Sequence, residues 1–295
     1  MKKFILFLII AFSFSFGQCF AAIDFDGVDD GIFFGDTNIL DGASAWAIYV
    51  RFNTSATTGS LTVKWQDSIA SGNGYAFLIT YSASEYTLGH GCAPCTGTTS
   101  YGSTTDADLS TGVWHTIVWN GSADIDGYTV YEDNVQLTFS KTADNPGNIS
   151  STTTSFFGIG CRANASNACD TAEGSEMDGI ISEFAIWNAN LTATEISLLN
   201  SSKVRSTPLM IKPSNLKMYI TLDNLAEGSS ANGATLSDRK QSGFNGTGDD
   251  GANNTGLTAI AEESLSYADY SEYTNFSIEA GLIMNDFFGN DFIAN

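Results

Sequence analysis

The chain has 295 residues, enough for one large β domain or two smaller ones, and its 33 acidic and 12 basic residues give a formal net charge of −21 at pH 7. This balance disfavours partners such as nucleic acid and anionic membranes, because phosphate binding requires clustered Lys and Arg. Cations and neutral glycans remain compatible partners, and solubility alone is the default explanation of the charge.

The N-terminus has the pattern of a secretory signal peptide over residues 1–22. Lys2-Lys3 is a short basic start, Phe4 to Phe16 is apolar, and Cys19-Phe20-Ala21 offers a small-residue cleavage site. The apolar stretch is shorter than the roughly 20 residues that cross a bilayer. We therefore expect a secreted protein, extracellular or on the cell surface, with no membrane insertion once the signal is removed.

Short segments with alternating apolar and polar residues follow, separated by clusters of Gly, Ser, Thr, Asn and Asp. They lie at 45–52, 75–81, 114–119, 128–137, 156–159 and 180–187. In the first, Trp46, Ile48 and Val50 are expected on one face and Tyr49 on the other. Glu132-Asp133-Asn134 is expected to form a hairpin turn. Many short strands with regular turn signals favour an all-β fold, an antiparallel β-sandwich or jelly roll.

The last third of the chain departs from this pattern. Thr192 and Glu195 fit a capping box that starts a short helix. Basic residues and prolines then concentrate in 203–214, which reads as a linker. Residues 215–295 are expected to form a C-terminal extension of strands and loops.

Two segments carry a family resemblance over residues 23–202. The opening Phe25-Asp26-Gly27-Val28-Asp29-Asp30 and the closing Ile181-Ser182-Glu183-Phe184-Ala185-Ile186-Trp187-Asn188 resemble the first and last strands of the laminin G-like, concanavalin A-like jelly roll. Trp114-His115-Thr116-Ile117-Val118 resembles a further strand of that family. The resemblance implies a sandwich in which the opening and closing strands are neighbours.

A later stretch resembles the same family in a different place. Tyr219-Ile220-Thr221-Leu222-Asp223 and Gly243-Phe244-Asn245-Gly246-Thr247-Gly248 are similar to a segment that normally precedes the opening strand. Two interpretations follow. The strand completes the same sandwich in a permuted order, or it begins a second, truncated module.

The functional expectation is non-catalytic recognition, with lectin-like binding of a glycan or a cell-surface protein. Loops carry the function of a sandwich, and sugars stack on exposed aromatic rings. Trp65, Tyr86 and Tyr101 lie in or beside loop-like segments and are the candidate ligand-binding residues. Edge packing of these rings is the simpler alternative. A structural or self-assembling surface protein, with self-association of the chain, is the alternative function.

The resemblance also implies a calcium ion, because related jelly rolls often hold one between the opening and closing strands. Asp26, Asp29 and Asp178 would supply the carboxylate oxygens that such a hard cation prefers. The alternative is turn chemistry without a metal, since Asp-Gly pairs favour tight turns.

Retaining β-glucanases of this fold class carry two glutamates on one strand, and this pattern is incomplete here. Glu176 and Asp178 are present, but Ile180 and Ile181 stand where the second glutamate would be. We therefore expect no catalytic residues, with a divergent glycoside hydrolase as the remaining alternative.

Four cysteines remain after the signal, namely Cys92, Cys95, Cys161 and Cys169. An even number in an exported protein predicts disulfides. Four cysteines allow three pairings, and the sequence leaves the pairing open.

Overall fold

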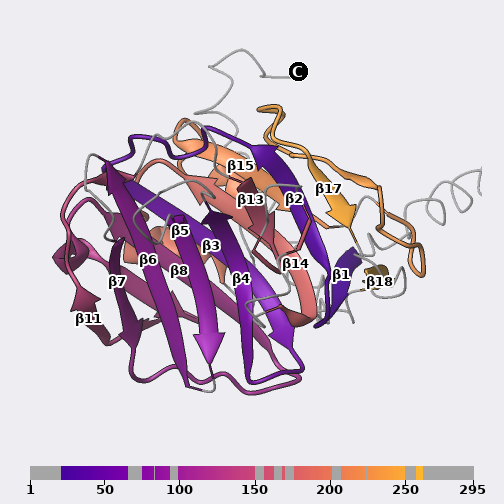
Figure 1. The fold of residues 1–295 in the computed structure, drawn as a ribbon, viewed down its shortest axis with the longest axis horizontal. Helices are drawn as coiled ribbons and strands as arrows, with labels where there is room; N and C mark the ends of the chain where they lie inside the picture. The colour runs from indigo at the N-terminus through magenta and orange to yellow at the C-terminus, as the bar shows by residue number, and fades with distance from the viewer. Residues whose placement is uncertain are drawn as a thin grey trace, which may run out of the picture. The chain divides into compact units, whose positions relative to one another are not determined.

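The computed structural model describes residues 21–65, 75–82, 84–93, 99–149, 156–162, 168–169, 176–200, 207–222, 225–249 and 257–261. These residues form two antiparallel β-sheets packed face to face, as the sequence predicts (Figure 1). The described part contains a single α-helix, α2 (Ala193–Leu199), and two 3₁₀ turns, η1 (Ile125–Gly127) and η2 (Pro208–Met210).

The first sheet has the strand order β10-β9-β8-β3-β14-β1-β18, and β15 pairs with β14. Its strands are β1 (Ala21–Asp26), β3 (Ala45–Thr54), β8 (Trp114–Ser122), β9 (Thr129–Glu132), β10 (Val135–Leu137), β14 (Asp178–Trp187), β15 (Leu216–Thr221) and β18 (Thr258–Ala261).

The second sheet has the strand order β11-β7-β6-β5-β4-β13-β2-β17-β16, and β12 pairs with β6. Its strands are β2 (Gly31–Asp36), β4 (Thr58–Trp65), β5 (Tyr75–Ser82), β6 (Glu85–Ala93), β7 (Thr99–Thr104), β11 (Phe139–Ala143), β12 (Asn148–Ile149), β13 (Phe156–Ile159), β16 (Thr235–Leu236) and β17 (Gly246–Asp249).

The opening and closing strands are neighbours. β1 pairs with β14, with Ile23 opposite Ile181 and Asp26 opposite Asp178. β1 begins at Ala21, so the expected start of the domain at residue 23 falls inside this strand. Ala22 is buried and lies opposite Ile260 of β18. The rest of the expected signal peptide lies outside the described residues.

The segment after residue 215 completes the same sandwich. β15 pairs with β14, β17 pairs with β2, and β18 pairs with β1 (Figure 1). β1 and β15 therefore pair with the same edge of β14. β1 pairs with its first residues and β15 with its last. The structure therefore agrees with the first interpretation of this stretch, in which it completes the same sandwich in a permuted order. Residues 262–295 of the expected extension lie outside the described part.

The alternation in β3 separates two clusters of apolar side chains. Trp46, Ile48 and Val50 lie in the core between the sheets, whereas Tyr49 faces away from it. The ring of Trp46 contacts that of Trp119 edge to face, with centroids 5.5 Å apart. Burial of each such side chain contributes about 1.5–3 kcal/mol, so this face selection determines the register of the sheet.

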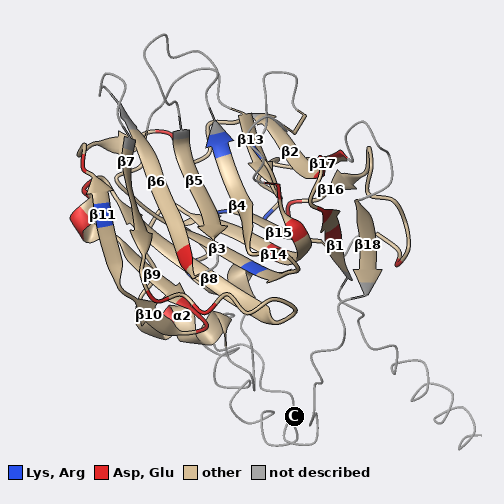
Figure 2. Ribbon diagram, turned by 60° about the horizontal axis from the view of Figure 1, so that its bottom comes forward, with Lys and Arg blue, Asp and Glu red and all other residues tan. Residues whose placement is uncertain are grey.

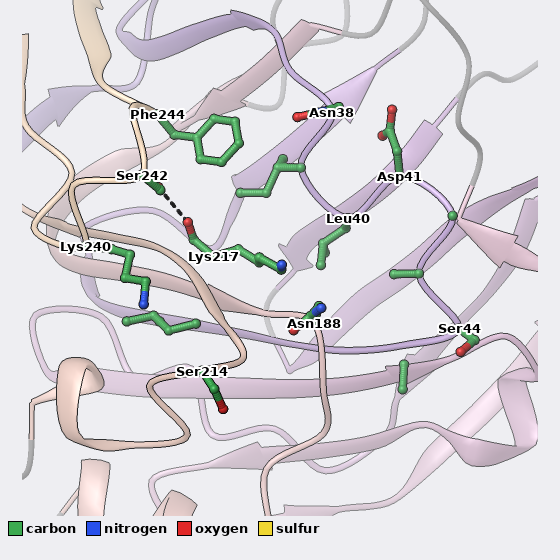
Figure 3. Close-up of a pocket in the computed structure, with 15 residues that line it drawn as sticks. Asn38, Leu40, Asp41, Ser44, Asn188, Ser214, Lys217, Lys240, Ser242 and Phe244 are labelled. Carbon is green, nitrogen blue, oxygen red and sulfur yellow. Dashed lines mark hydrogen bonds between the residues drawn. The ribbon is translucent and has the colours of Figure 1, made fainter.

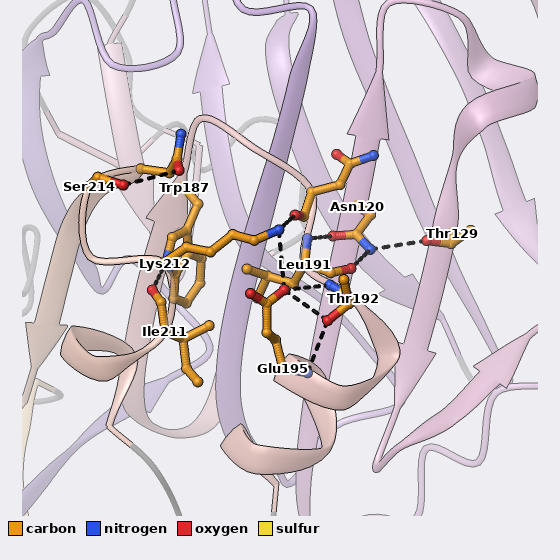
Figure 4. Close-up of polar contacts among 11 residues, drawn as sticks. Asn120, Thr129, Trp187, Leu191, Thr192, Glu195, Ile211, Lys212 and Ser214 are labelled. Atoms are coloured by element: carbon orange, nitrogen blue, oxygen red, sulfur yellow. Dashed lines mark hydrogen bonds and ion pairs between the residues drawn. The ribbon is translucent and has the colours of Figure 1, made fainter. Parts of the chain in front are cut away.

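The outer face of the first sheet is covered by α2 and by the segment from Thr207 to Ser214. The indole Nε1 of Trp187 donates to the carbonyl of Ile211 at 2.7 Å (Figure 4). Lys212 donates to the carbonyl of Asn190 at 2.6 Å and pairs with Glu195 at 3.2 Å. The described part of the expected linker 203–214 is therefore packed against the sheet, because Ile211 is apolar and buried there.

Two local predictions are confirmed. Thr192 and Glu195 form the reciprocal capping box at the start of α2. Asp133 and Asn134 connect β9 to β10 with positive φ angles of 47° and 74°, the geometry that a two-residue hairpin turn requires.

Candidate functional site

A cleft of about 710 Å³ opens where loops from both sheets meet (Figure 3). Its walls come from residues 38–45 between β2 and β3, from Asn188 after β14, from the start of β15, and from residues 240–244 before β17. The lining combines amides, hydroxyls, two lysines and one aromatic ring. The side chains that the site uses are Asn38, Ser44, Asn188, Lys217, Lys240 and Phe244.

One wall of the cleft is held by Asp238, which is buried. Its carboxylate accepts hydrogen bonds from the backbone amides of Tyr219, Lys240 and Ser242, each at 2.9 Å. The hydroxyl of Ser242 also donates to the carbonyl of Lys217 at 2.8 Å. Because these bonds tie the loop to β15, the loop that carries Lys240 is set in place before any ligand arrives.

The opposite wall contains a neutralised acidic side chain. Lys64 of β4 has 0% of its side chain exposed and forms an ion pair with Asp41. Its ammonium group also donates to the carbonyl of Ile39 at 3.1 Å. The carboxylate of Asp41 is therefore compensated, and this pair anchors the loop between β2 and β3.

The other lysines divide into two groups. Lys141 pairs with two carboxylates and Lys212 with one. Within the described part of the chain, Lys217 has no carboxylate within 4.0 Å, and the ammonium of Lys240 donates only to the carbonyl of Pro213 at 2.8 Å. Both uncompensated lysines line the cleft. Figure 2 shows the two paired lysines of the second sheet as the blue segments of β4 and β11.

A second charged region lies in the turn between β1 and β2. Carboxylate oxygens of Asp26, Asp29 and Asp30 all lie within 4.8 Å of one another. Asp30 accepts the backbone amide of Asp26 at 2.7 Å, and Asp26 accepts that of Val28 at 2.9 Å. We call residues 26–30 the acidic turn.

Asp178 lies against the acidic turn as the strand partner of Asp26. Gly27 has a φ of 76°, and a Cβ atom there would lie 2.7 Å from the Cβ of Asp178, so only glycine fits. Of the three expected metal ligands, Asp26 and Asp29 therefore lie together in the turn and Asp178 lies beside them. Asp30 is a further carboxylate that was not expected. This oxygen-rich donor set fits a hard divalent cation.

Burial and neighbouring negative charges both act on Asp24, which lies next to this region. Burial raises the pKa of the Asp24 carboxyl, and the negative charges of Asp178 and Asp26 raise it further. A group with a raised pKa disfavours its own ionised form, so the folded chain holds these carboxylates together at a cost in free energy.

The structure describes the side chains of two of the three expected ligand-binding aromatic residues, and one of them does not fit that role. Tyr86 has 0% of its surface exposed and donates its hydroxyl to Glu132 at 2.6 Å, which makes it a core residue and corrects the expectation for it. Tyr101 is 39% exposed on β7. Trp65 ends β4, which is separated from β7 by β5 and β6, and its side chain lies outside the described part. Neither Tyr86 nor Tyr101 lines the cleft.

The cleft residues were missed because they come from four separate stretches of sequence. The available signal was the scarcity of basic residues, against which Lys217 and Lys240 stand out, with Lys240 four residues before Phe244. For Tyr86, the alternation with Leu88 and His90 already marked an inward face.

One disulfide joins Cys161 to Cys169 and packs beside Phe33. A Cβ atom on Gly31, directly after the acidic turn, would lie 2.9 Å from the sulfur of Cys161. The disulfide therefore closes over the start of β2. Cys92 lies in β6, and its side chain, like Cys95, is outside the described residues.

The buried ionisable groups outside these regions are engaged in structural hydrogen bonds. His115 faces Asp133 through Nδ1 at 3.0 Å and the carbonyl of Ser110 through Nε2 at 3.1 Å. Burial lowers the pKa of His115, but the hydrogen bonds to Asp133 and Ser110 and the negative charges of Asp133 and Glu132 outweigh it and raise the pKa overall. Glu183 accepts the hydroxyls of Tyr49 and Tyr219.

Comparison with known proteins supports the fold. No protein-family model and no curated protein sequence matches the chain. A proposed carbohydrate-binding protein from Bacteroides ovatus is similar in structure with a TM-score of 0.50 and 14% identity, covering 84% of this chain and 61% of its own. This chain thus spans less than two thirds of that protein.

Two other similar structures are smaller matches. Domains LG4-5 of the mouse laminin α1 chain give a TM-score of 0.40 and 11% identity, covering 56% of this chain and 40% of that one. The CBM40 module of a Ruminococcus gnavus IT-sialidase, bound to α2,3-sialyllactose, gives 0.46 and 12%, covering 63% and 100%. The two antiparallel sheets and the pairing of β1 with β14 confirm the predicted β-sandwich with neighbouring opening and closing strands.

Within the described residues, no helix has the length and apolar character needed to cross a bilayer.

Proposed function

We propose that this chain is an exported, non-catalytic recognition module that binds a glycan in the manner of a lectin. The observation that carries the proposal is the cleft, in which amides and hydroxyls able to hydrogen-bond sugar hydroxyls lie beside the ring of Phe244. Figure 3 shows Asn38 and Phe244 turned toward each other across it. Polar groups beside one aromatic face are the combination that saccharides require.

The fold gives independent support for this class of function. The Bacteroides ovatus protein, whose similarity covers 84% of this chain, is itself proposed to bind carbohydrate. Export is supported by the sequence of residues 1–22 and by the Cys161–Cys169 disulfide, since disulfides persist in oxidising compartments. A cell-surface protein as ligand, or self-association, is an alternative outcome of the binding test.

Binding without catalysis is supported by β14. Asp178 belongs to the acidic turn, Ile180 and Ile181 carry no carboxylate, and both oxygens of Glu183 accept tyrosine hydroxyls. Incubation of the protein with a bound oligosaccharide is therefore expected to release no reducing sugar.

A glycan array probed with the secreted chain tests the proposal. Asn38→Ala and Ser44→Ala in the cleft should each weaken binding about three- to tenfold, the effect of one lost hydrogen bond. Thr142→Ala on β11 is the matched control and should bind as the unaltered chain does. An array without signal for any glycan, or binding that is indifferent to both cleft variants, would contradict the proposal.

We also propose a structural calcium ion at the acidic turn, held by Asp26, Asp29 and Asp30 with Asp178 beside them. The support is the convergence of their oxygens within 4.8 Å for the first three, together with the raised pKa of Asp24. A bound cation would offset this repulsion and fix the junction between the opening and closing strands.

A further inference from the structure

We propose that the cleft selects saccharides that carry one or two negative charges, as a uronate or a sulfate ester, over neutral saccharides and over polyanions. This inference rests on the proposed glycan-binding function and names the ligand class of the same site.

The first step is the local charge. In a chain of net charge −21, the two lysines without a carboxylate partner in the described part both line this cleft. Among the described lining residues, the one carboxylate, that of Asp41, is already paired with Lys64. The cleft therefore presents two uncompensated positive charges, and an anionic group on a ligand would pair with them.

The second step is the placement of these charges. Lys217 extends across the cleft toward Leu40 and Asn188, whereas Lys240 lies on the other side near Ser214 (Figure 3). Both backbones are tied down, because Asp238 and Ser242 connect the loop of Lys240 to β15. Two lysines fixed on separate elements lose less entropy on binding than lysines on a free loop.

The third step is the chemistry of the remaining lining. Asn38, Asn188 and Ser44 offer donors and acceptors for hydroxyl groups, and Phe244 offers an apolar face. A free inorganic anion would accept hydrogen bonds from the amide and hydroxyl donors but would make no use of the face of Phe244, whereas a charged sugar would use all of these groups together with the lysines.

The fourth step limits the charge of the ligand. The whole protein repels a polyanion, because its net charge of −21 acts over the Debye length of about 10 Å at 0.1 M salt. Two lysines compensate only one or two charges at short range. A disaccharide with one carboxylate fits this balance, whereas a polymer charged at every residue does not.

Calorimetric titration of the secreted chain with matched disaccharides tests the inference. Each disaccharide is used in a neutral form, with a carboxylate at C6 and with a sulfate at C6, on gluco-, galacto- and manno-configured backbones. Polygalacturonate is the polymeric probe. The carboxylate and sulfate arms distinguish the two sources of charge. We expect an anionic form to bind at least tenfold more tightly than its neutral partner.

Variants assign the effect to the lysines. Lys217→Gln and Lys240→Gln should each weaken binding of the anionic disaccharide roughly tenfold, as expected for loss of a charge-assisted contact, and leave the neutral form unchanged. Lys141→Gln is the control, because that lysine pairs with Asp126 and Asp144 instead. Unchanged melting temperatures establish that the variants fold.

The outcomes separate the two proposals. Equal affinity for neutral and anionic forms, or insensitivity to both lysine variants, overturns the charge selectivity and leaves glycan binding intact. Tighter binding of polygalacturonate per site than of the disaccharide overturns the charge limit. Absence of binding to every saccharide overturns the proposed function, and the inference fails with it.

Discussion

The two ends of strand β2 carry opposite charge arrangements. The acidic turn directly precedes Gly31, and the loop that lines the cleft follows Asp36, so about 20 Å of one strand separates them. At the first end, carboxylate oxygens of Asp26, Asp29 and Asp30 gather within 4.8 Å of one another. At the second end, the single carboxylate is neutralised and two lysines are left over.

This difference shows that net charge says little about a local site. A total of −21 suits cations, and the acidic turn follows that expectation. The cleft departs from that expectation, because Lys64 compensates Asp41 inside the protein while Lys217 and Lys240 line the cleft. Ion pairing in the fold therefore decides which charges remain available for binding.

The largest effect is expected from breaking the buried pair at the cleft end. Asp41→Asn leaves the ammonium of Lys64 buried without its carboxylate, which should lower the free energy of unfolding by about 3 kcal/mol in urea denaturation. The combined change Asp41→Leu with Lys64→Met should recover much of the loss, because no charge remains buried. A neutral outcome for Asp41→Asn alone would refute the pairing.

At the acidic end, addition of calcium should stabilise the fold. Calcium at a hundredfold excess over its dissociation constant adds about 2.7 kcal/mol, read as a raised melting temperature. Asp26→Asn with Asp29→Asn should abolish the gain. Asp126→Asn is the control, since the cluster of Asp124, Asp126 and Asp144 already holds the ammonium of Lys141. A calcium response that survives the double variant would place the ion elsewhere.

An intermediate effect is expected from Asp238→Asn, which loosens the wall of the cleft. One oxygen of the carboxylate becomes an amide group that cannot accept a hydrogen bond. Either the backbone amides of Tyr219 and Lys240 or that of Ser242 then lose their acceptor, at a cost of roughly 2 kcal/mol. Binding of the anionic disaccharide should weaken as well, since Lys240 loses its fixed position. Lost stability with unchanged affinity would separate the loop from the binding site.

The smallest effect is a pH dependence at the acidic end. Because the pKa of Asp24 is raised in the folded chain, its contribution to stability is present below the unfolded pKa and is lost as the pH rises through the folded value. Asp24→Asn should flatten this part of the stability profile, at pH values above the ordinary pKa of an aspartate. Saturating calcium should flatten it in the same way. A variant profile parallel to that of the unaltered chain would contradict this assignment.

Much of the fold was predictable from local sequence. Alternation identified the inward face of β3, the Asp133-Asn134 turn set a hairpin, and the capping box of Thr192 located the helix. Each depends on residues within one element, whose periodicity is visible in the sequence.

The cleft was not predictable in this way. Its lysines matter because they remain unpaired, and pairing depends on contacts such as that of Lys64 with Asp41, which are 23 residues apart. The burial of Tyr86 also depends on residues distant in sequence. Its ring lies beside a predicted turn, but strands from the other sheet bury it and its hydroxyl donates to Glu132. The acidic turn was predictable in part. Its aspartates are close together in sequence, whereas Asp178 lies beside them only because β1 pairs with β14.

The pairing of β1 with β18 has an architectural consequence. Ala21 lies directly opposite Ala261, so the described fold begins and finishes at the same point on its surface. A peptide of a few residues would join these positions and close the backbone into a ring. The same geometry lets the fold be inserted into an exposed loop of another protein, with both junctions side by side and the host strands on either side undisturbed.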